Sequence, residues 1–278
     1  MNNEWELLNT DKIGIVGCGH LGEAVAKALV GGGLKKENLL ISHRGNPQTY
    51  QKLEAQGLAS CLAKNERVFS EAKIVLLTVK PQDIPSLKES ALSSRALIAS
   101  CAAGVPLETL EEIFGENVLR IMLSGPDTVA DGRGVAAMYP ENEALKRLFC
   151  LMGLNLIKIR AEHDLDVFTA GVCLTAALLK TESPSEEGRA IEKIGLEYPL
   201  LKQLYVWAKD ALPEFENKTA KEEYIAKMAT KGGVTDAIIT SLERGAPLEE
   251  ALKRGIARTE EISLEIKNSL AAGKSRAT

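Results

Sequence analysis

Short apolar runs alternate with amphipathic stretches up to about residue 159. The runs have the length of β-strands, and the stretches between them have the 3.6-residue spacing of helices with one buried face. Strands that recur with helices between them predict right-handed βαβ units and a doubly wound, mostly parallel α/β sheet. The expected strands are Ile13–Val16, Leu39–Ser42, Ile74–Val79, Ala96–Ser100, Val118–Met122, Gly134–Met138 and Leu156–Arg160, and the expected helices are Glu23–Val30, Pro47–Gln56, Asp83–Leu92, Leu107–Phe114 and Glu143–Met152.

The pattern changes near Ala161, after which every periodic stretch has helical spacing. The change predicts two domains, a sheet domain over 1–160 and an all-α domain over 161–278. The expected helices of the second domain are Asp164–Thr181, Arg189–Ile194, Leu200–Leu212, Ala220–Ala229, Thr235–Glu243 and Leu248–Leu270, with a loop at 182–188 and a frayed polar tail from Ala272.

The stretch from Phe168 to Leu179 is apolar nearly all round. A helix of that kind must be covered on every side, which a small domain achieves with difficulty. We therefore expect a homodimer or higher homo-oligomer joined through the helical domain. The alternative is that the helices bury one another within a single chain.

A glycine-rich turn lies between the first expected strand and the first expected helix. It reads Gly17-Cys18-Gly19-His20-Leu21-Gly22. In a Rossmann-type domain such glycines allow a tight turn, close approach of the backbone to a diphosphate, and close packing of helix on strand. The N–H groups of the helix start then bind the phosphates. The turn predicts a dinucleotide cofactor, the alternative being a plain glycine turn that binds nothing.

The end of the second expected strand reads Ser42-His43-Arg44 and contains no acidic residue. An acidic residue about 20 positions beyond the fingerprint is typical of NAD sites, whereas a nearby arginine accommodates the 2′-phosphate of NADP. The planar guanidinium of Arg44 suits a phosphate dianion. NADPH is therefore the expected cofactor and NADH a possible one, unless Arg44 is only a solvated loop residue.

Composition narrows the class of protein. The 278-residue chain has a formal net charge of −4, with its basic residues scattered, which argues against nucleic acid as a partner. Its cysteines lack the spacing of disulfide frameworks, and its three histidines lack that of metal ligands, so we expect reduced thiols and no metal site. The acidic start is unlike a signal peptide, and no apolar run is long enough to span a membrane. These features predict a cytoplasmic protein.

Three further strand ends carry residues suited to a cofactor crevice, which in such sheets lies outside the carboxyl ends of the strands. Val79, Lys80 and Pro81 end one strand, and small residues at Ala102 and Ala103 leave room for a flat nicotinamide ring. Ser124 follows another strand.

In the helical half, Gly232-Gly233-Val234-Thr235 joins two expected helices. Paired glycines before a helix start expose backbone N–H groups that could bind a carboxylate. The alternative is ordinary capping, with Gly232 ending one helix and Thr235 starting the next.

These motifs together resemble the pyrroline-5-carboxylate reductase family from Ile13 to about Leu264. The resemblance rests on the glycine turn, Val79-Lys80-Pro81-Gln82, Ser100-Cys-Ala-Ala-Gly-Val105, Arg120 and Met122, Asp166 and Thr169, and Gly232-Gly233-Val234-Thr235 followed by Leu242-Glu243 and Gly245. It implies an N-terminal Rossmann domain, a helical dimerisation domain and a site formed where two subunits meet.

The family transfers a hydride from the nicotinamide to the C=N carbon of a cyclic imino acid, which gives L-proline. By position, the resemblance implies that Thr235 hydrogen-bonds the ring nitrogen and that the backbone of Gly232, Gly233 and Val234 binds the substrate carboxylate. Asn65, Lys80, Ala102 and Ala103 would line the cofactor.

Two departures leave the substrate open. Ser124 stands where the family has asparagine in Met-Pro-Asn-Thr-Pro, and it is the expected substrate contact there. Val172–Leu178 replaces the family's Ser-Gly-Ser-Gly-Pro-Ala-Tyr. Missing hydrogen-bond partners of this kind can exclude a substrate. The alternatives are a related NADP-dependent oxidoreductase with a different imine, carbonyl or deazaflavin acceptor, and a non-catalytic dinucleotide-binding sensor.

Overall fold

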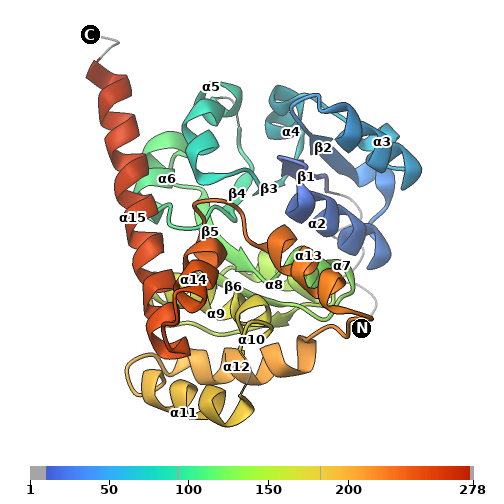
Figure 1. Cartoon of the computed structure of the whole chain (residues 1–278). Helices are drawn as coiled ribbons and strands as arrows, with labels where there is room; N and C mark the ends of the chain where they lie inside the picture. The colour runs from blue at the N-terminus through green and yellow to red at the C-terminus, as the bar shows by residue number, and fades with distance from the viewer. Residues whose placement is uncertain (1–10, 93, 182, 276–278) are drawn as a thin grey trace. The chain divides into compact units, whose positions relative to one another are not determined.

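The computed structural model describes residues 11–92, 94–181 and 183–275 (Figure 1). The described chain forms two compact units, one of residues 11–158 together with 266–275 and the other of residues 159–265. The long helix α15 (Leu248–Ser275) therefore contributes its last turns to the first unit, whereas the sequence pattern assigned all of 161–278 to one domain. The expectations for the acidic start and for the end of the tail lie outside the described residues.

The first unit is built on a seven-stranded sheet in the order β2-β1-β3-β4-β5-β6-β7. Strands β1 to β5 are parallel, β6 is antiparallel to β5, and β7 is parallel to β6, which confirms the mostly parallel α/β sheet. The strands are β1 (Ile13–Val16), β2 (Leu39–Ser42), β3 (Ile74–Leu77), β4 (Leu97–Ser100), β5 (Val118–Leu123), β6 (Val135–Tyr139) and β7 (Asn155–Leu156).

Strand register aligns the segments that bear the expected cofactor residues. Val16, the last residue of β1, is paired with Ser42 at the end of β2 and with Leu77 at the end of β3. Leu77 is in turn paired with Ser100, the end of β4. The loops that follow these four strands consequently leave the sheet at one edge, where ligands of open α/β sheets bind.

Helices cover both faces of this sheet, and its strands β1, β2 and β3 are buried along their whole length. They are α2 (His20–Gly31), α3 (Pro47–Ala55), α4 (Asn65–Glu71), α5 (Lys88–Ala91), α6 (Leu107–Phe114), α7 (Pro126–Ala130) and α8 (Glu143–Leu151). The expectation of an α-helix over Asp83–Leu92 was largely wrong. Residues Pro81–Leu87 form a 3₁₀ segment, because Pro85 inside it has no N–H for an α-helical bond.

The second unit is helical among its described residues. Its helices are α9 (Asp164–Val172), α10 (Leu174–Leu178), α11 (Pro184–Ile194), α12 (Leu200–Ala211), α13 (Lys218–Met228), α14 (Val234–Glu243) and the first part of α15. The expected single helix over Asp164–Thr181 is two helices that meet at Cys173. The expected loop at 182–188 was also wrong from Pro184 onward, and α15 extends four residues into the expected tail.

Glycines let the helices of the second unit approach closely. A Cβ built on Gly171 of α9 would lie 2.3 Å from a methyl carbon of Leu204 in α12. A Cβ on Gly255 of α15 would lie 2.6 Å from the Cδ1 atom of Ile238 in α14. Since real Cβ atoms are not found at such separations, these contacts require the absence of a side chain. The Gly255 contact packs α15 against α14, and the expected substrate residues lie at the start of α14.

Candidate functional site

The glycine turn after β1 is held against the loop after β3. Gly17 has a φ of +95°, which favours glycine, and its N–H donates to the carbonyl of Ser42 at 3.1 Å. The hydroxyl of Thr78 donates to the carbonyl of Gly17 at 2.5 Å. A Cβ on Gly17 would lie 2.5 Å from the Cγ1 atom of Val79. The turn is therefore fixed to the segment that bears Val79.

The two other glycines of the turn have opposite surroundings. A Cβ on Gly22 would lie 2.3 Å from the Gly17 carbonyl oxygen, so the start of α2 packs directly on the turn. A Cβ on Gly19 would meet nothing within 4 Å in the chain. Gly22 is thus required by packing, while Gly19 leaves an open backbone surface that a ligand could approach.

The open start of α2 offers donors at this surface. Gly19 is its N-cap and has no side chain to accept a hydrogen bond, and the first helical bond runs from the Glu23 N–H to the Gly19 carbonyl at 2.9 Å. The N–H groups of His20, Leu21 and Gly22 precede that bond and have no acceptor within the helix. Together with the helix dipole they form a surface suited to an anion.

Cys18 contributes only its backbone to this turn. Its thiol is buried, and burial raises its pKa to about 11, with the nearby Glu23 carboxylate adding to the shift. The thiol is consequently neutral at pH 7 and is not a nucleophile there.

Arg44 lies in the loop after β2, and its guanidinium forms an ion pair with the carboxylate of Asp83, which follows β3. The Arg44 side chain is 72% exposed and that of Asp83 is 21% exposed. The Nδ1 atom of His43 accepts a hydrogen bond from the Gly45 N–H at 3.1 Å, which shapes the same loop. The sequence suggested Arg44 but not its carboxylate partner.

Loops after β3 and β4 place the other expected cofactor residues. Lys80 is exposed and precedes Pro81, the first residue of the 3₁₀ segment. Ala102 is buried, and its N–H donates to the Ser100 hydroxyl at 3.3 Å in a turn that leaves Ala103 partly exposed. Asn65 starts α4 and is partly exposed.

Ser124 is not arranged to contact a ligand. It is 2% exposed, and its hydroxyl accepts the Val135 N–H at 3.1 Å and shares a hydrogen bond with the Thr128 hydroxyl at 2.8 Å. These bonds tie β5 to β6 and to α7. The expectation that Ser124 contacts the substrate rested on its position in the sequence. In this structure its hydroxyl bonds to groups within the chain.

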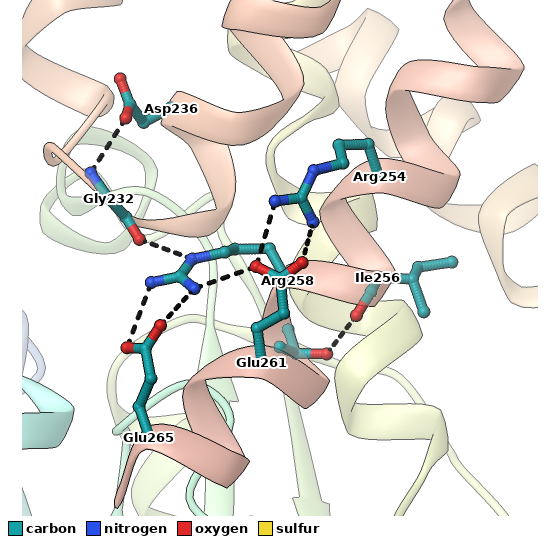
Figure 2. Close-up of polar contacts among 8 residues, drawn as sticks. Gly232, Asp236, Arg254, Ile256, Arg258, Glu261 and Glu265 are labelled. Carbon is teal, nitrogen blue, oxygen red and sulfur yellow. Dashed lines mark hydrogen bonds and ion pairs between the residues drawn. The ribbon is translucent and has the colours of Figure 1, made fainter.

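In the second unit, the loop before α14 uses two of its three expected N–H donors internally. Gly232 has a φ of +73°, and its N–H donates to the Asp236 carboxylate at 2.9 Å (Figure 2). The Gly233 N–H donates to the Thr230 carbonyl at 2.8 Å. Val234 begins α14, so the N–H groups of its first turn have no acceptor within the helix.

Arg258 of α15 anchors this loop from the other side. Its Nε donates to the Gly232 carbonyl at 2.8 Å, and its Nη1 pairs with Glu265 at 2.6 Å and with Glu261 at 3.0 Å (Figure 2). Arg254 adds a two-pronged pair to Glu261 at 2.7 and 3.0 Å. Both arginines are paired with carboxylates on later turns of their own helix. The network therefore holds the loop in place, and the charges of both guanidinium groups are balanced by glutamates.

Thr235, the expected catalytic residue, is partly exposed on the first turn of α14. Its Oγ1 lies 3.2 Å from the Sγ of Cys173, the residue between α9 and α10. A groove of about 520 Å³ borders the same loop, but Thr235 is not among its lining residues, which include Gly232, Asp236 and Arg258. The hydroxyl of Thr235 and this groove are therefore separate features of the unit.

Several known proteins are similar to this chain over both units. The pyrroline-5-carboxylate reductase 2 of Bacillus subtilis (strain 168) is 27% identical over 271 residues, which cover 94% of this chain and 96% of the relative. The reductase of that name from Corynebacterium melassecola is 28% identical over 250 residues, covering 83% and 90%. Over most of its length the chain is similar to pyrroline-5-carboxylate reductases, and it is an oxidoreductase.

Two further similarities concern the fold and the sheet unit. A solved structure of the Plasmodium falciparum pyrroline carboxylate reductase with NADP bound has a TM-score of 0.56 and 20% identity, covering 92% of this chain and 99% of that chain, and it supports the fold. The model of a family described as NADP oxidoreductase, coenzyme F420-dependent, matches residues 12–104, within the sheet.

Other site types find little support in the described residues. They contain no group of three or more histidine, cysteine, aspartate or glutamate residues that could hold a metal ion. None of the described helices is both long and apolar enough to cross a membrane.

Proposed function

We propose that this chain is an NADPH-dependent reductase of a small cyclic imino acid, converting pyrroline-5-carboxylate to L-proline. The observation that carries the proposal is similarity along nearly the whole chain to reductases of that name, across both units. The retained Gly232-Gly233-Val234-Thr235 motif supports it, because it is the part of the helical half suited to an anionic cyclic substrate.

The residues present fit a dinucleotide. Gly19 has space for a diphosphate where any side chain would project, and the first N–H groups of α2 provide the donors. Arg44 would bind the 2′-phosphate, which requires it to exchange Asp83 for the phosphate. Asn65, Val79, Lys80 and Pro81 would line the cofactor, with Ala102 and Ala103 beside the nicotinamide. The bound cofactor supplies the hydride.

The substrate would be held by α14. The hydroxyl of Thr235 would contact the ring nitrogen, and the N–H groups of Val234 and Thr235 would bind the carboxylate at the positive end of the helix. Gly232 and Gly233 would act chiefly through the shape of the loop, since their N–H groups already donate to Asp236 and Thr230. Positioning of this kind lowers the barrier without requiring a strong acid.

A second candidate is a reductase of the same cofactor type that acts on a deazaflavin. The family model matched at 12–104 favours it, because its description names coenzyme F420. That match lies within the sheet unit, however, and leaves the helical half unaccounted for. The relatives that span both units favour the imino acid.

The test is consumption of NADPH by the purified protein with pyrroline-5-carboxylate, followed by absorbance and by chromatographic detection of proline. We expect turnover, at least tenfold slower turnover in Thr235→Ala, and partial recovery in Thr235→Ser, which keeps the hydroxyl. Consumption of NADPH with an oxidised deazaflavin or another imine as the hydride acceptor, and none with pyrroline-5-carboxylate, would reject the assignment.

The proposal includes a homodimer or higher homo-oligomer in the cytoplasm. The single chain already buries α9 and α10 nearly all round, so the oligomer is proposed on the resemblance to pyrroline-5-carboxylate reductases alone. The five free cysteines motivate the cytoplasmic location. Light scattering coupled to size-exclusion chromatography measures the oligomeric state, and a monomer at micromolar concentration would contradict the proposed oligomer.

A further inference from the structure

The hydroxyl of Thr235 belongs to a short, partly buried chain of hydrogen bonds. The Cys173 Sγ lies 3.1 Å from the carbonyl oxygen of Thr169, one helical turn earlier in α9, and 3.2 Å from the Thr235 Oγ1. Cys173 is 9% exposed and Thr169 is 5% exposed, so water does not compete freely for these atoms. The thiol therefore connects a backbone carbonyl to the hydroxyl proposed to meet the substrate nitrogen.

Counting protons fixes the direction of each bond. A thiol carries one proton and a carbonyl can only accept, so the Cys173 thiol donates to the Thr169 carbonyl. The remaining bond must then run from the Thr235 hydroxyl to the sulfur. Burial raises the pKa of the Cys173 thiol to about 11, so the thiol keeps its proton near neutral pH and this arrangement persists there.

We propose that Cys173 is a positioning residue that makes the Thr235 hydroxyl a hydrogen-bond acceptor, so that the site selects the protonated form of the imine. The inference rests on the proposed function. With its proton directed at sulfur, the hydroxyl presents oxygen lone pairs, which attract an N–H group and repel the lone pair of a neutral imine nitrogen.

This selection matches the chemistry of the reduction. The protonated imine is the electrophilic form. When the hydride forms the new C–H bond, the π electron pair of the C=N bond moves to nitrogen, which loses its positive charge and keeps its proton. Thr235 therefore need not transfer a proton during the step. A hydroxyl that donated instead would stabilise the unprotonated and less reactive imine.

The inference also gives a role to the segment that departs from the family pattern. Val172–Leu178 replaces a polar, glycine-rich segment with buried apolar residues. Cys173 is the member of that segment whose side chain contacts Thr235. The substitution thus removes a polar, glycine-rich surface and adds the Cys173 contact to Thr235.

The test compares two ring ligands of nearly the same shape in the presence of NADPH. L-proline has N–H donors at the ring nitrogen, while tetrahydrofuran-2-carboxylate has an ether oxygen that can only accept. Calorimetry would measure both dissociation constants in the wild type, Cys173→Ala, Cys173→Val and Cys173→Ser. Cys150→Ala is the matched control, because Cys150 is exposed on α8 of the sheet unit.

We expect the wild type to bind L-proline more tightly than tetrahydrofuran-2-carboxylate. The ratio of the two dissociation constants should fall about tenfold in Cys173→Ala and Cys173→Val, because the Thr235 hydroxyl can then rotate and donate. Ala is smaller than Cys and Val is larger, so agreement of these two variants excludes a packing effect. Cys173→Ser should keep the preference, because a serine hydroxyl can also donate to Thr169 and accept from Thr235. Cys150→Ala should match the wild type, and NADPH affinity should be equal in all.

An unchanged preference in Cys173→Ala and Cys173→Val overturns the inference and leaves the proposed function standing if the wild type reduces pyrroline-5-carboxylate. A wild type that neither reduces the imine nor binds either ligand overturns the proposed function, and the inference with it.

Discussion

Arg44 and Asp83 form an ion pair between two segments that flank β1. Arg44 follows β2 and Asp83 follows β3, and in the sheet these strands lie on opposite sides of β1. The pair therefore lies at the edge where the glycine turn begins. The Asp83 carboxylate is paired with the Arg44 guanidinium that we propose binds the cofactor's 2′-phosphate. The carboxylate and the phosphate therefore compete for Arg44.

Asp83→Asn should tighten NADPH binding several-fold and leave NADH binding nearly unchanged, because it removes the competing charge near the phosphate. Fluorescence titration with each nucleotide measures both constants. The same substitution in an Arg44→Ala background should have no such effect on NADPH. A similar gain for NADPH and NADH would mean that Asp83 acts on some other part of the nucleotide.

Arg44→Ala should weaken NADPH binding by roughly tenfold to a hundredfold, the range expected for a charge-assisted hydrogen bond. NADH lacks the 2′-phosphate and should lose far less. Arg67→Ala is a control, since Arg67 is an exposed arginine of the same unit paired with Glu71. Equal losses for the two nucleotides would show that Arg44 does not read the phosphate.

Gly19→Ala should leave stability unchanged and strongly reduce NADPH affinity, because its Cβ meets nothing in the chain and projects where the diphosphate would lie. Gly22→Ala should instead destabilise the fold by about 1–3 kcal/mol, since its Cβ overlaps the Gly17 carbonyl. Thermal unfolding and nucleotide titration separate the two effects.

Gly31→Ala, at the far end of α2, is the control for both variants. A Cβ there also meets nothing within 4 Å, and alanine favours a helix. Undiminished NADPH affinity in Gly19→Ala would contradict the assignment of the diphosphate to this turn.

Asp236→Asn should lower the KM for an anionic substrate by roughly twofold to tenfold, because a carboxylate in the first turn of α14 repels the substrate carboxylate. The asparagine carbonyl can still accept the Gly232 N–H, so the loop should keep its shape. Steady-state kinetics measures the change, with Glu223→Gln on exposed α13 as a charge-matched control. A raised KM would show that Asp236 aids binding.

Buried Cys101 should make the protein less stable in alkali. Burial raises the pKa of its thiol from 9.0 to about 12, so the folded chain holds this proton more tightly than the unfolded chain. That contribution is complete below pH 9 and is lost as pH rises toward about 12. Urea unfolding of Cys101→Ala should show a flatter decline across this range than the wild type, whereas exposed Cys150→Ala should not.

Local pattern predicted most of the strands well because each is a short apolar run between turn residues, but the strand expected at Leu156–Arg160 was wrong, since β7 is Asn155–Leu156. The bounds of β1 and β2 match the expected Ile13–Val16 and Leu39–Ser42. Helices α4 and α7 were missed because segments of 7 and 5 residues span too few turns to show a period. The antiparallel direction of β6 depends on its pairing with β5 and is not encoded in the period of either strand.

The local sequence pattern could not predict which residues the candidate site residues contact. Glycine spacing predicted the left-handed turn at Gly17 and the tight contact at Gly22, since both follow from the absence of a side chain. The Arg44–Asp83 pair and the Cys173–Thr235 contact join residues far apart in the chain, and no sequence period links them. The cofactor and substrate roles of these residues stay predictions until the variants above are measured.

The junction between α9 and α10 changes the angular phase of the helix. Around Cys173 the N–H of residue 173 donates to the carbonyl of residue 170, and the N–H of residue 176 to that of residue 173, both three residues back. Such bonds wind the backbone at about three residues per turn instead of 3.6. Each tightened step advances the following side chains by about 20° relative to an uninterrupted α-helix. A variant that straightened this junction would rotate Leu174 and its successors about their own axis and present different side chains to α12 and α14.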